Sequence, residues 1–478
     1  MNQSIISEMK KVLEIQKQLH IQEGPPSLEL RKDRLDRCIA MIKKYQEKII
    51  SSLQEDFGNR DPVMSMATEV ASAIGPLEYA KKHVSKWIKP EKRKAEIAPL
   101  GPLLGLMGAS ARIQYQPLGT IGCISPWNFP VNLVMAPLGG ILAAGNRAMI
   151  KPSEHTPSTS NITKKMFEEF FNQEEIAVFT GDPEVGAAFS SLPFDHLIFT
   201  GGTAIAKHVM KAASENLVPL TLELGGKSPV VVGKNSDISS AAIRVMQGKT
   251  MNAGQICLAP DYALVPKDKL DEFVKESVKA VSAMYPSLKD NDDYTSIINE
   301  KHFERIKSYL DDAKDKGAEL VEINPSDEDF SQQPHYKIPP TLVLNPSEDM
   351  KLMQEEIFGP VLPIKSYEKV EESVDFINTK ERPLGLYYFG NDKKEQDYVL
   401  KNTTSGGVTV NDVISHVTME TLPFGGVGPS GMGSYHGYDG FKEFSHAKSI
   451  YKQTKINLNK LAGLVPPYKS KTDKASSL

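Results

Sequence analysis

Hydrophobic residues at helical spacing predict two long helices near the start of the chain. Gly24-Pro25-Pro26 breaks the chain, and Ser27 can accept hydrogen bonds from the first free amides of a following helix. The apolar residues that then recur at intervals of three, four or seven are Leu35, Ile39, Ile42, Ile49 and Leu53. This pattern predicts an amphipathic helix that starts at Leu28 and ends before Gly58. A second helical stretch covers Ala67 to about Trp87.

Prolines interrupt the helical pattern after Trp87. Pro90, Pro99 and Pro102 cannot continue a helix, and nearby glycines add flexibility. Residues Arg112–Gln116 then alternate between polar and apolar side chains, as in a half-buried strand. The region therefore predicts a hairpin arm that leaves the main body.

From Ile121 onward, short apolar runs alternate with helical stretches. The runs that predict strands are GTIGCIS, RAMIKPSE, AVFTG, HLIFTGG, LTLELGG and SPVVVG. Helical patterns lie between them near 133–144 and 161–171 and in KHVMKAASE, and a second α/β segment runs from about Ala241 to Asn411. Such alternation predicts the α/β fold class, with mostly parallel sheets covered by helices.

Composition narrows the kind of protein. A chain of 478 residues exceeds the size at which one hydrophobic core stops growing, so two or more domains are expected. A net charge of −4 gives no electrostatic basis for binding nucleic acid or an anionic membrane. Three cysteines (Cys38, Cys123 and Cys257) cannot form a disulfide framework, which favours a reducing, cytoplasmic location.

The two ends of the chain carry no clear targeting or membrane segment. The N-terminus lacks the apolar stretch of a secretory signal, and no window approaches the roughly 18 apolar residues of a membrane-spanning helix. The Lys/Ser-rich tail from Lys452 to Leu478 is interpreted as a surface extension, with a peripheral membrane contact as the alternative.

Three residues are candidates for covalent chemistry at a carbonyl group. Cys257 follows the polar turn Asn-Ala-Gly-Gln, where nearby amides can lower a thiol pKa, although a lone cysteine is more often a small buried residue. Glu223 ends an apolar strand, at the edge where parallel sheets bind ligands, with an ion pair to Lys227 as the alternative. Asn128 lies between Pro126 and Pro130, and its rigid carboxamide can stabilise an oxyanion or merely its own turn.

Three further segments are candidates for binding a dinucleotide. Lys151 and Glu154 follow an apolar strand and can bind ribose hydroxyls or phosphate. Thr200-Gly201-Gly202 forms a strand-to-helix turn that allows close approach of a pyrophosphate, although it does not fit the G-x-G-x-x-G pattern. Glu356 and Phe358 combine a carboxylate with a ring. A solvated loop, a plain glycine turn and a helix end are the respective alternatives.

The joint occurrence of these motifs in one order is more specific than any of them alone. The segments PWNFP (126–130), LELGGKSP (222–229), GQIC (254–257) and EEIFGPV (355–361) resemble the aldehyde dehydrogenase superfamily over nearly the whole chain. CLAPDY (257–262), SGGVTVND (405–412) and LPFGGVGPSGMGSYHG (422–437) resemble its class 3 group, which includes enzymes for fatty, aromatic and coniferyl aldehydes.

The resemblance implies a domain organisation and an assembly. It implies a Rossmann-like NAD(P)-binding domain at residues 1–98 and 118–225 and an α/β catalytic domain at 226–411. A small β oligomerisation arm and bridging segments would occupy 99–117 and 412–450, followed by a C-terminal tail at 451–478. The resemblance also suggests a homodimer.

The resemblance further implies roles for the candidate residues. Cys257 would be the nucleophile, Glu223 the general base, and Asn128 the oxyanion donor together with the Cys257 amide. The cofactor contacts would be Lys151 and Glu154 at the adenosine ribose, Thr200, Gly201 and Gly202 at the pyrophosphate, Glu356 at the nicotinamide ribose and Phe358 beside the ring. An aromatic, coniferyl-type or medium-chain aliphatic aldehyde would be oxidised through a thioester that water hydrolyses. No metal is required, and the sequence has no H-E-x-x-H motif.

Some features leave alternatives open. The charge of Glu154 favours NAD, while class 3 relatives often tolerate NADP as well. Ala206 and Ile256 stand where many relatives have Gly and Thr, which affects the packing of the cofactor helix and the shape beside the thiol. Transfer of the acyl group to coenzyme A and a non-catalytic paralogue are rival hypotheses. The presence of both Cys257 and Glu223 favours hydrolytic catalysis over these two.

Overall fold

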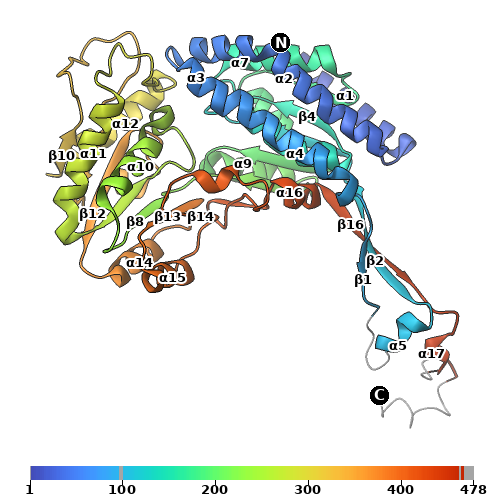
Figure 1. The fold of residues 1–478 in the computed structure, drawn as a ribbon. Helices are drawn as coiled ribbons and strands as arrows, with labels where there is room; N and C mark the ends of the chain where they lie inside the picture. The colour runs from blue at the N-terminus through green and yellow to red at the C-terminus, as the bar shows by residue number, and fades with distance from the viewer. Residues whose placement is uncertain (1, 96–100, 462–464, 468–478) are drawn as a thin grey trace.

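The computed structural model describes residues 2–95, 101–461 and 465–467, and it contains two large sheets and a small one (Figure 1). The first large sheet has the strand order β15-β7-β6-β3-β4-β5. Its strands are β3 (Thr120–Ile124), β4 (Arg147–Lys151), β5 (Ile176–Val178), β6 (His196–Thr200), β7 (Leu220–Glu223) and β15 (Gly431–Met432). All of them are parallel except β15, which runs antiparallel to β7.

Helices cover both faces of this six-stranded sheet. One face packs against α2 (Leu28–Phe57), α4 (Ser72–Trp87), α6 (Asn132–Ala144) and α7 (Pro157–Phe170). The other face packs against α1 (Asn2–Glu23), α8 (Pro183–Ser190) and α9 (Thr203–Ser214). Burial on both faces explains why its parallel strands appear in the sequence as continuous apolar runs.

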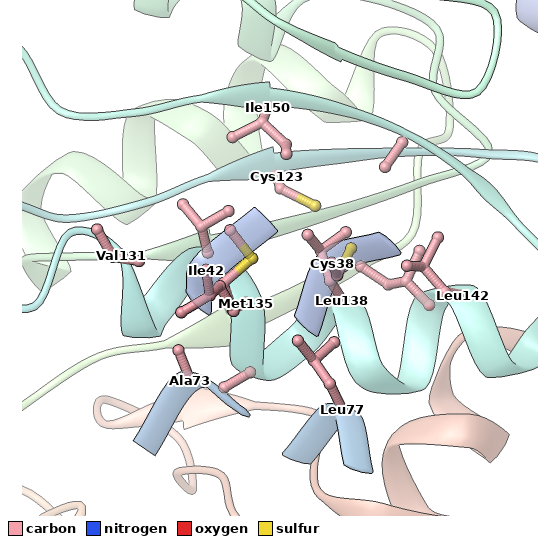
Figure 2. Packing of buried hydrophobic residues seen from close by; sticks show 14 of the residues in the cluster. Cys38, Ile42, Ala73, Leu77, Cys123, Val131, Met135, Leu138, Leu142 and Ile150 are labelled. Carbon is pink, nitrogen blue, oxygen red and sulfur yellow. The ribbon is translucent and has the colours of Figure 1, made fainter. Parts of the chain in front are cut away.

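Figure 2 shows part of the core on the first face, where residues of α2, α4 and α6 pack below the sheet. Ile42 of α2, Leu77 of α4 and Leu138 of α6 are fully buried there. Cys38 and Cys123 are buried in the same cluster and form no disulfide. Burial raises the pKa of both thiols, so they behave as small apolar side chains.

The two helices predicted from the sequence are present. The Ser27 hydroxyl accepts a hydrogen bond from the Leu30 amide at 3.2 Å, and Gly58 ends α2 with a φ of 71°. The second helical stretch begins earlier than predicted, because α3 (Pro62–Ser65) and a π-helical turn (Met66–Ala71) lead directly into α4.

Helix α1 was not predicted. Its apolar face buries Met9, Val12 and Leu13 against the sheet. The fully buried Gln16 donates hydrogen bonds to the carbonyls of Ala148 (3.2 Å) and Gln173 (2.6 Å). The spacing of these four buried residues is the helical signal that the sequence contained.

The second large sheet has the strand order β10-β11-β12-β9-β8-β13-β14, and only β10 is antiparallel to its neighbour. Its strands are β8 (Pro229–Val232), β9 (Tyr262–Pro266), β10 (Glu319–Glu322), β11 (Thr341–Leu344), β12 (Val361–Tyr367), β13 (Gly385–Phe389) and β14 (Gly407–Val410). Its helices are α10 (Ile238–Thr250), α11 (Leu270–Met284), α12 (Glu300–Asp315), α13 (Lys351–Gln354), α14 (Val370–Asn378) and α15 (Lys393–Asn402). The predicted α/β class is therefore confirmed.

The small sheet forms an arm that projects from the body (Figure 1). It consists of β1 (Glu91–Arg93), β2 (Ser110–Pro117) and β16 (Ser445–Lys452), in the order β1-β2-β16. The predicted hairpin arm is present, because β1 and β2 pair antiparallel. The third strand, β16, was not predicted; it pairs with β2 from the C-terminal part of the chain and follows α16 (Gly437–Glu443).

Two short helices, α5 (Gly101–Leu106) and α17 (Leu458–Leu461), lie at the outer end of the arm (Figure 1). Much of the predicted tail at 451–478 lies outside the described residues, as do residues 96–100. Among the described helices, none is long and apolar enough to cross a membrane.

Candidate active site

A cavity of about 1040 Å³ brings most of the predicted site residues together. The residues of the prediction that line it are Asn128, Thr200, Gly201, Gly202, Glu223, Cys257, Glu356 and Phe358. Thr200 and Glu223 end the neighbouring parallel strands β6 and β7, where the C-terminal edge of a parallel sheet is expected to bind ligands. Cys257 lies in the segment before β9, and Glu356 lies in the segment before β12; both strands belong to the second large sheet.

Glu223 is a buried carboxyl group without a partner. Its side chain is 2% exposed, and neither carboxylate oxygen has a hydrogen-bond partner among the described residues. Lys227 pairs with Asp261 instead, so the alternative of an ion pair between Glu223 and Lys227 was wrong. Burial raises the pKa of Glu223 well above its usual value. An unpaired buried carboxyl group is costly for folding, which favours a functional role beside a cavity.

Cys257 follows a sharply turned segment, the 3₁₀ helix Met251–Gly254. Asn252, Ala253 and Gly254 have φ values of 50°, 52° and 73°, which only glycine adopts without cost. At Gly254, a Cβ atom would lie 2.3 Å from the carbonyl oxygen of Gly359. This turn therefore fixes where the half-buried thiol enters the cavity.

The thiol is less acidic than its turn suggested. Burial raises the pKa of Cys257 well above its usual value, and the nearby carboxylates of Glu223 and Glu356 raise it further. The backbone amides of Cys257 and Leu258 hydrogen-bond the sulfur and lower the pKa, as expected from the sequence, but burial outweighs them. The lower pKa that these amides alone would give the thiol is therefore not the net result.

The Asn128 side chain is tied to the loop that leads to Cys257. Its side-chain nitrogen Nδ2 donates to the backbone carbonyl of Gln255 at 3.1 Å. The side-chain nitrogen Nδ2 of Asn252 donates to the same oxygen at 3.2 Å. A carboxamide has two N–H donors, so one remains for a group bound in the cavity that Asn128 lines. This arrangement supplies a donor close to the nucleophile's loop.

The turn after β6 fits a negatively charged group. The Glu223 carbonyl accepts a hydrogen bond from the Gly201 amide at 3.1 Å, which joins this turn to β7. Helix α9 begins at Thr203 with Gly202 as its N-cap, and no side chain caps it. Its free amides and helix dipole therefore favour an anion at the cavity wall, as a pyrophosphate requires. Ala206 is buried in the core below the helix, so its methyl group does not face the cavity.

Glu356 is held on a segment that an ion pair fixes. The Lys227 ammonium pairs with Asp261 and donates to the carbonyls of Leu352 (2.7 Å) and Glu355 (3.0 Å). Asp261 also accepts the Ile357 amide at 2.9 Å. Burial raises the pKa of Glu356 to about 7. A carboxylate fixed in this way fits the hydroxyl groups of a ribose.

Phe358 and Trp127 form an aromatic wall of the cavity. Their ring centroids are 5.4 Å apart, and the Phe358 backbone has a φ of 48°. Ile256, which precedes the nucleophile, is 6% exposed and packs into the main core. The Thr-to-Ile difference beside the thiol therefore affects core packing more than the cavity wall.

Lys151 and Glu154 are not among the residues that line this cavity. Lys151 ends β4 and Glu154 follows it, and β4 is separated from β6 by β3 alone. Strands lie about 4.8 Å apart, so this edge is about 10 Å from the Thr200 turn. The Lys151 ammonium, which is almost fully buried, contacts the Pro152 carbonyl at 2.9 Å and Glu154 at 3.3 Å.

Several cavity residues were missed by sequence reasoning. His302 and Arg305 lie on α12, where a spacing of three places them on one face of the helix. The His302 ring is 5.0 Å from Trp127, and burial lowers the pKa of His302 to about 4. Lys380 and Arg382 line the cavity from the loop after α14. None of these four belongs to a motif that the sequence analysis singled out.

A sequence model described as the aldehyde dehydrogenase family matches residues 24–450. The chain belongs to the aldehyde dehydrogenase family. A probable coniferyl aldehyde dehydrogenase from Caulobacter vibrioides is 59% identical over 96% of this chain and 94% of its own length. A coniferyl aldehyde dehydrogenase from Pseudomonas sp. strain HR199 is 51% identical over the same shares of the two chains.

Solved structures of aldehyde dehydrogenases agree with the fold. A substrate-bound state of AldH from Staphylococcus aureus superposes with a TM-score of 0.88 at 36% identity, and 98% of each chain is covered. Betaine aldehyde dehydrogenase from Staphylococcus aureus in complex with NAD+ has a TM-score of 0.82 at 26% identity, covering 95% of this chain and 88% of the other. The chain is thus an NAD(P)-dependent oxidoreductase that oxidises aldehydes.

Proposed function

We propose that this aldehyde dehydrogenase releases a free carboxylic acid, with Cys257 as nucleophile, Glu223 as general base and Asn128 as oxyanion donor. The observation that carries this proposal is the unpaired, buried carboxyl group of Glu223 in the cavity that also contains the half-buried Cys257 thiol. Such a group, in its ionised form, can accept a proton from the water molecule that attacks the enzyme-bound acyl group. An enzyme that delivers its acyl group to coenzyme A needs no base at this place.

The reaction begins when the Cys257 sulfur attacks the aldehyde carbon and loses its proton. The second N–H of Asn128 and the Cys257 amide then hold the oxyanion, and the loss of one such donor typically costs about 10²–10³ in turnover. When bound, the nicotinamide cofactor would supply the hydride acceptor. Loss of the hydride leaves an acyl group on the Cys257 sulfur. Glu223 takes a proton from water, which attacks this thioester and releases the acid. The sum is aldehyde, oxidised cofactor and water to acid, reduced cofactor and a proton.

The cofactor-binding proposal follows the edge of the six-stranded sheet. Lys151 and Glu154 would bind the adenosine ribose, and Thr200, Gly201 and Gly202 the pyrophosphate. Glu356 would bind the nicotinamide ribose, with Phe358 beside the ring. The half-exposed Glu154 carboxylate favours NAD over NADP, because it repels a 2′-phosphate. The order of these residues from β4 to β7 supports a dinucleotide that crosses the C-terminal ends of the strands.

A coniferyl-type aromatic aldehyde is the proposed substrate. Two relatives that share 59% and 51% of their aligned residues with this chain carry that name. A screen of reduced-cofactor formation should give the highest kcat/KM for coniferyl aldehyde, above benzaldehyde and medium-chain aliphatic aldehydes, and with NAD above NADP. A preference for an aliphatic aldehyde by tenfold or more would contradict this part of the proposal.

We also propose the domain division, the assembly and the location. The division is an NAD(P)-binding domain at 1–98 and 118–225, a catalytic domain at 226–411, bridging segments at 99–117 and 412–450, and a tail at 451–478. A homodimer is supported by β16, an exposed edge strand of eight residues that another chain can cover. Light scattering of the purified protein tests this. A cytoplasmic location is supported by three unpaired cysteines.

Glu223→Gln separates water from coenzyme A as the acyl acceptor. This variant should form one equivalent of reduced cofactor per site in a burst and then turn over slowly. Added coenzyme A should not restore turnover or yield acyl-coenzyme A. Undiminished steady-state turnover would place the base elsewhere. An inert Cys257 thiol in the wild-type protein would instead favour a non-catalytic paralogue.

A further inference from the structure

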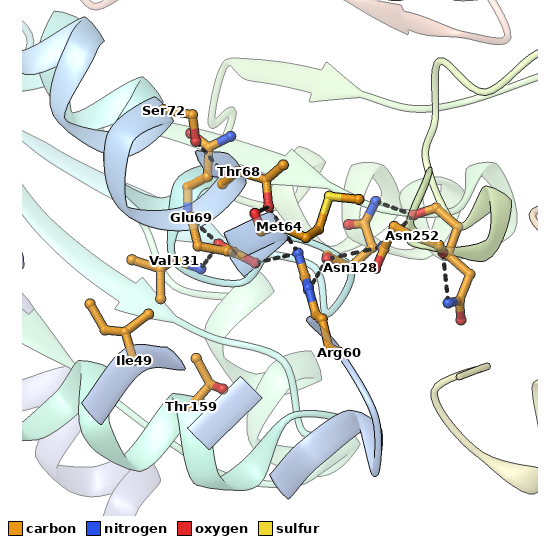
Figure 3. Close-up of polar contacts among 12 residues, drawn as sticks. Ile49, Arg60, Met64, Thr68, Glu69, Ser72, Asn128, Val131, Thr159 and Asn252 are labelled. Carbon is orange, nitrogen blue, oxygen red and sulfur yellow. Dashed lines mark hydrogen bonds and ion pairs between the residues drawn. The ribbon is translucent and has the colours of Figure 1, made fainter. Parts of the chain in front are cut away.

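A fully buried ion pair lies behind the loop that carries Asn128 (Figure 3). Arg60 and Glu69 are both 0% exposed, and the guanidinium Nη2 is 3.2 Å from the carboxylate Oε1. Arg60 follows the end of α2, and Glu69 lies in the π-helical turn before α4. The cavity that contains Cys257 does not reach Arg60 or Glu69, because neither residue lines it.

The pair holds the Asn128 loop at both ends. Arg60 Nη1 donates to the backbone carbonyl of Asn128 at 2.8 Å. Glu69 Oε2 accepts the backbone amides of Val131 at 3.0 Å and Asn132 at 2.9 Å. The guanidinium also lies 5.1 Å from the ring centroid of Phe129, between these two points. One ion pair therefore holds the backbone at both ends of the segment from Asn128 to the start of α6.

Stability alone does not account for this pair. Removing two charges from water costs several kcal/mol per ion, and a well-packed apolar pair of similar volume is often equally stable or more stable. Arg60 Nε has no partner among the described residues, so even the hydrogen bonding is incomplete. A π-helical turn is itself uncommon and is frequent at functional sites. The directional contacts to the loop are what an apolar replacement would lose.

The loop's position controls the oxyanion donor. Asn128 Nδ2 reaches the Gln255 carbonyl, two residues before Cys257, so a shift of the Asn128 backbone moves its free N–H relative to the sulfur. We propose that Arg60 and Glu69 are positioning residues that set the Asn128 carboxamide for transition-state stabilisation. This inference rests on the proposed role of Asn128. A misplacement of about 1 Å in such a site can cost about 10²-fold in rate.

Arg60→Met and Arg60→Lys test the proposal, with a stopped-flow burst of reduced cofactor as the readout. Lysine keeps the charge beside Glu69 but cannot reach both Glu69 and the Asn128 carbonyl with one nitrogen. We expect the burst rate to fall by about 10- to 100-fold in Arg60→Met and less in Arg60→Lys. Arg60→Lys keeps the test valid if Arg60→Met does not fold.

Two readouts distinguish positioning from general damage. Alkylation of Cys257 by iodoacetamide forms no oxyanion, so its rate should stay within about twofold of wild type, as should the Kd for the oxidised cofactor. Arg34→Met is the matched control, because Arg34 is a buried arginine near the start of α2 that pairs with Glu175. It should lower the melting temperature and leave the burst unchanged.

A double-mutant cycle with Asn128→Ala decides the matter. If Asn128 is the oxyanion donor, Asn128→Ala lowers the burst rate, and Arg60→Lys should add less than about twofold in that background. An Asn128→Ala variant with a normal burst would refute the proposed role of Asn128 itself. If Asn128→Ala slows the burst, three results would refute the positioning role. These are normal bursts in the Arg60 variants, additive effects of Arg60→Lys and Asn128→Ala on the burst rate, and a loss of alkylation in the Arg60 variants that parallels the loss of the burst.

Discussion

Alanine at Gly225 should displace Glu356 and slow hydride transfer without unfolding the enzyme. A Cβ atom at this position would lie 2.3 Å from Oε1 and 2.6 Å from Oε2 of Glu356. Close carbon–oxygen contacts in proteins are about 3.3 Å, so the carboxylate must withdraw by about 1 Å. Gly225 is not among the glycines with positive φ, so alanine is compatible with its backbone.

The size of the effect follows from that displacement. A shift of about 1 Å at a group that positions a reactant can lower the rate by about 10²-fold, equivalent to about 2.7 kcal/mol. The clashing atoms are the end of a side chain, so the fold can adjust by moving Glu356 alone. The melting temperature should therefore change by only a few degrees.

Stopped-flow measurement of the reduced-cofactor burst is the assay, at several cofactor concentrations. Gly225→Ala should lower the burst rate by about 10- to 100-fold and raise the KM for the cofactor. Gly105→Ala is the matched control, because no atom of a described residue lies within 4 Å of a Cβ atom there and the residue is in the arm. A normal burst and a normal KM in Gly225→Ala would refute the claim that Glu356 contacts the cofactor.

Three further predictions concern the thiol, its turn and the core. Glu356→Gln should speed iodoacetamide alkylation of Cys257 above pH 7, because removal of the negative charge lowers the thiol pKa. Below pH 6 the substitution should leave the alkylation rate unchanged, because Glu356 is already neutral there. An equal effect at both pH values would contradict this prediction. Gly254→Ala should slow the same alkylation and destabilise the protein, because alanine at a φ of 73° costs about 1–2 kcal/mol before the clash with the Gly359 carbonyl is counted; unchanged alkylation would show that the turn does not place the thiol. Leu77→Ala, in the core of Figure 2, should lower the free energy of unfolding by about 2–5 kcal/mol in denaturant titration and leave the rate per active site unchanged.

Local signals in the sequence were sufficient for much of the fold. Ser27 and Gly58 marked both ends of α2, and the apolar runs near β6 and β7 predicted parallel strands. The pairing of β2 with β16 could not be predicted, because nothing in either strand specifies a partner so distant in the sequence. Helix α1 differs from this case, because the helical spacing of Met9, Val12, Leu13 and Gln16 was present in the sequence, although no helix was predicted there.

The site was predictable where a motif carried it and unpredictable where contacts across the fold decided. Cys257, Glu223 and Asn128 lie in short motifs and meet in one cavity. His302 and Arg305 reach the same cavity from α12 without any motif. The raised pKa of the Cys257 thiol also needed the structure, because it depends on burial and on carboxylates that are distant in the sequence.

The central claim is that Cys257 carries the acyl group and Glu223 activates the water that removes it. Mass spectrometry of intact Glu223→Gln, mixed with an aldehyde and oxidised cofactor, tests both parts at once. We expect a mass increase equal to the aldehyde less two hydrogens, located on Cys257 after digestion and absent from Cys257→Ala. A burst of reduced cofactor without this adduct, or an adduct on another residue, would contradict it.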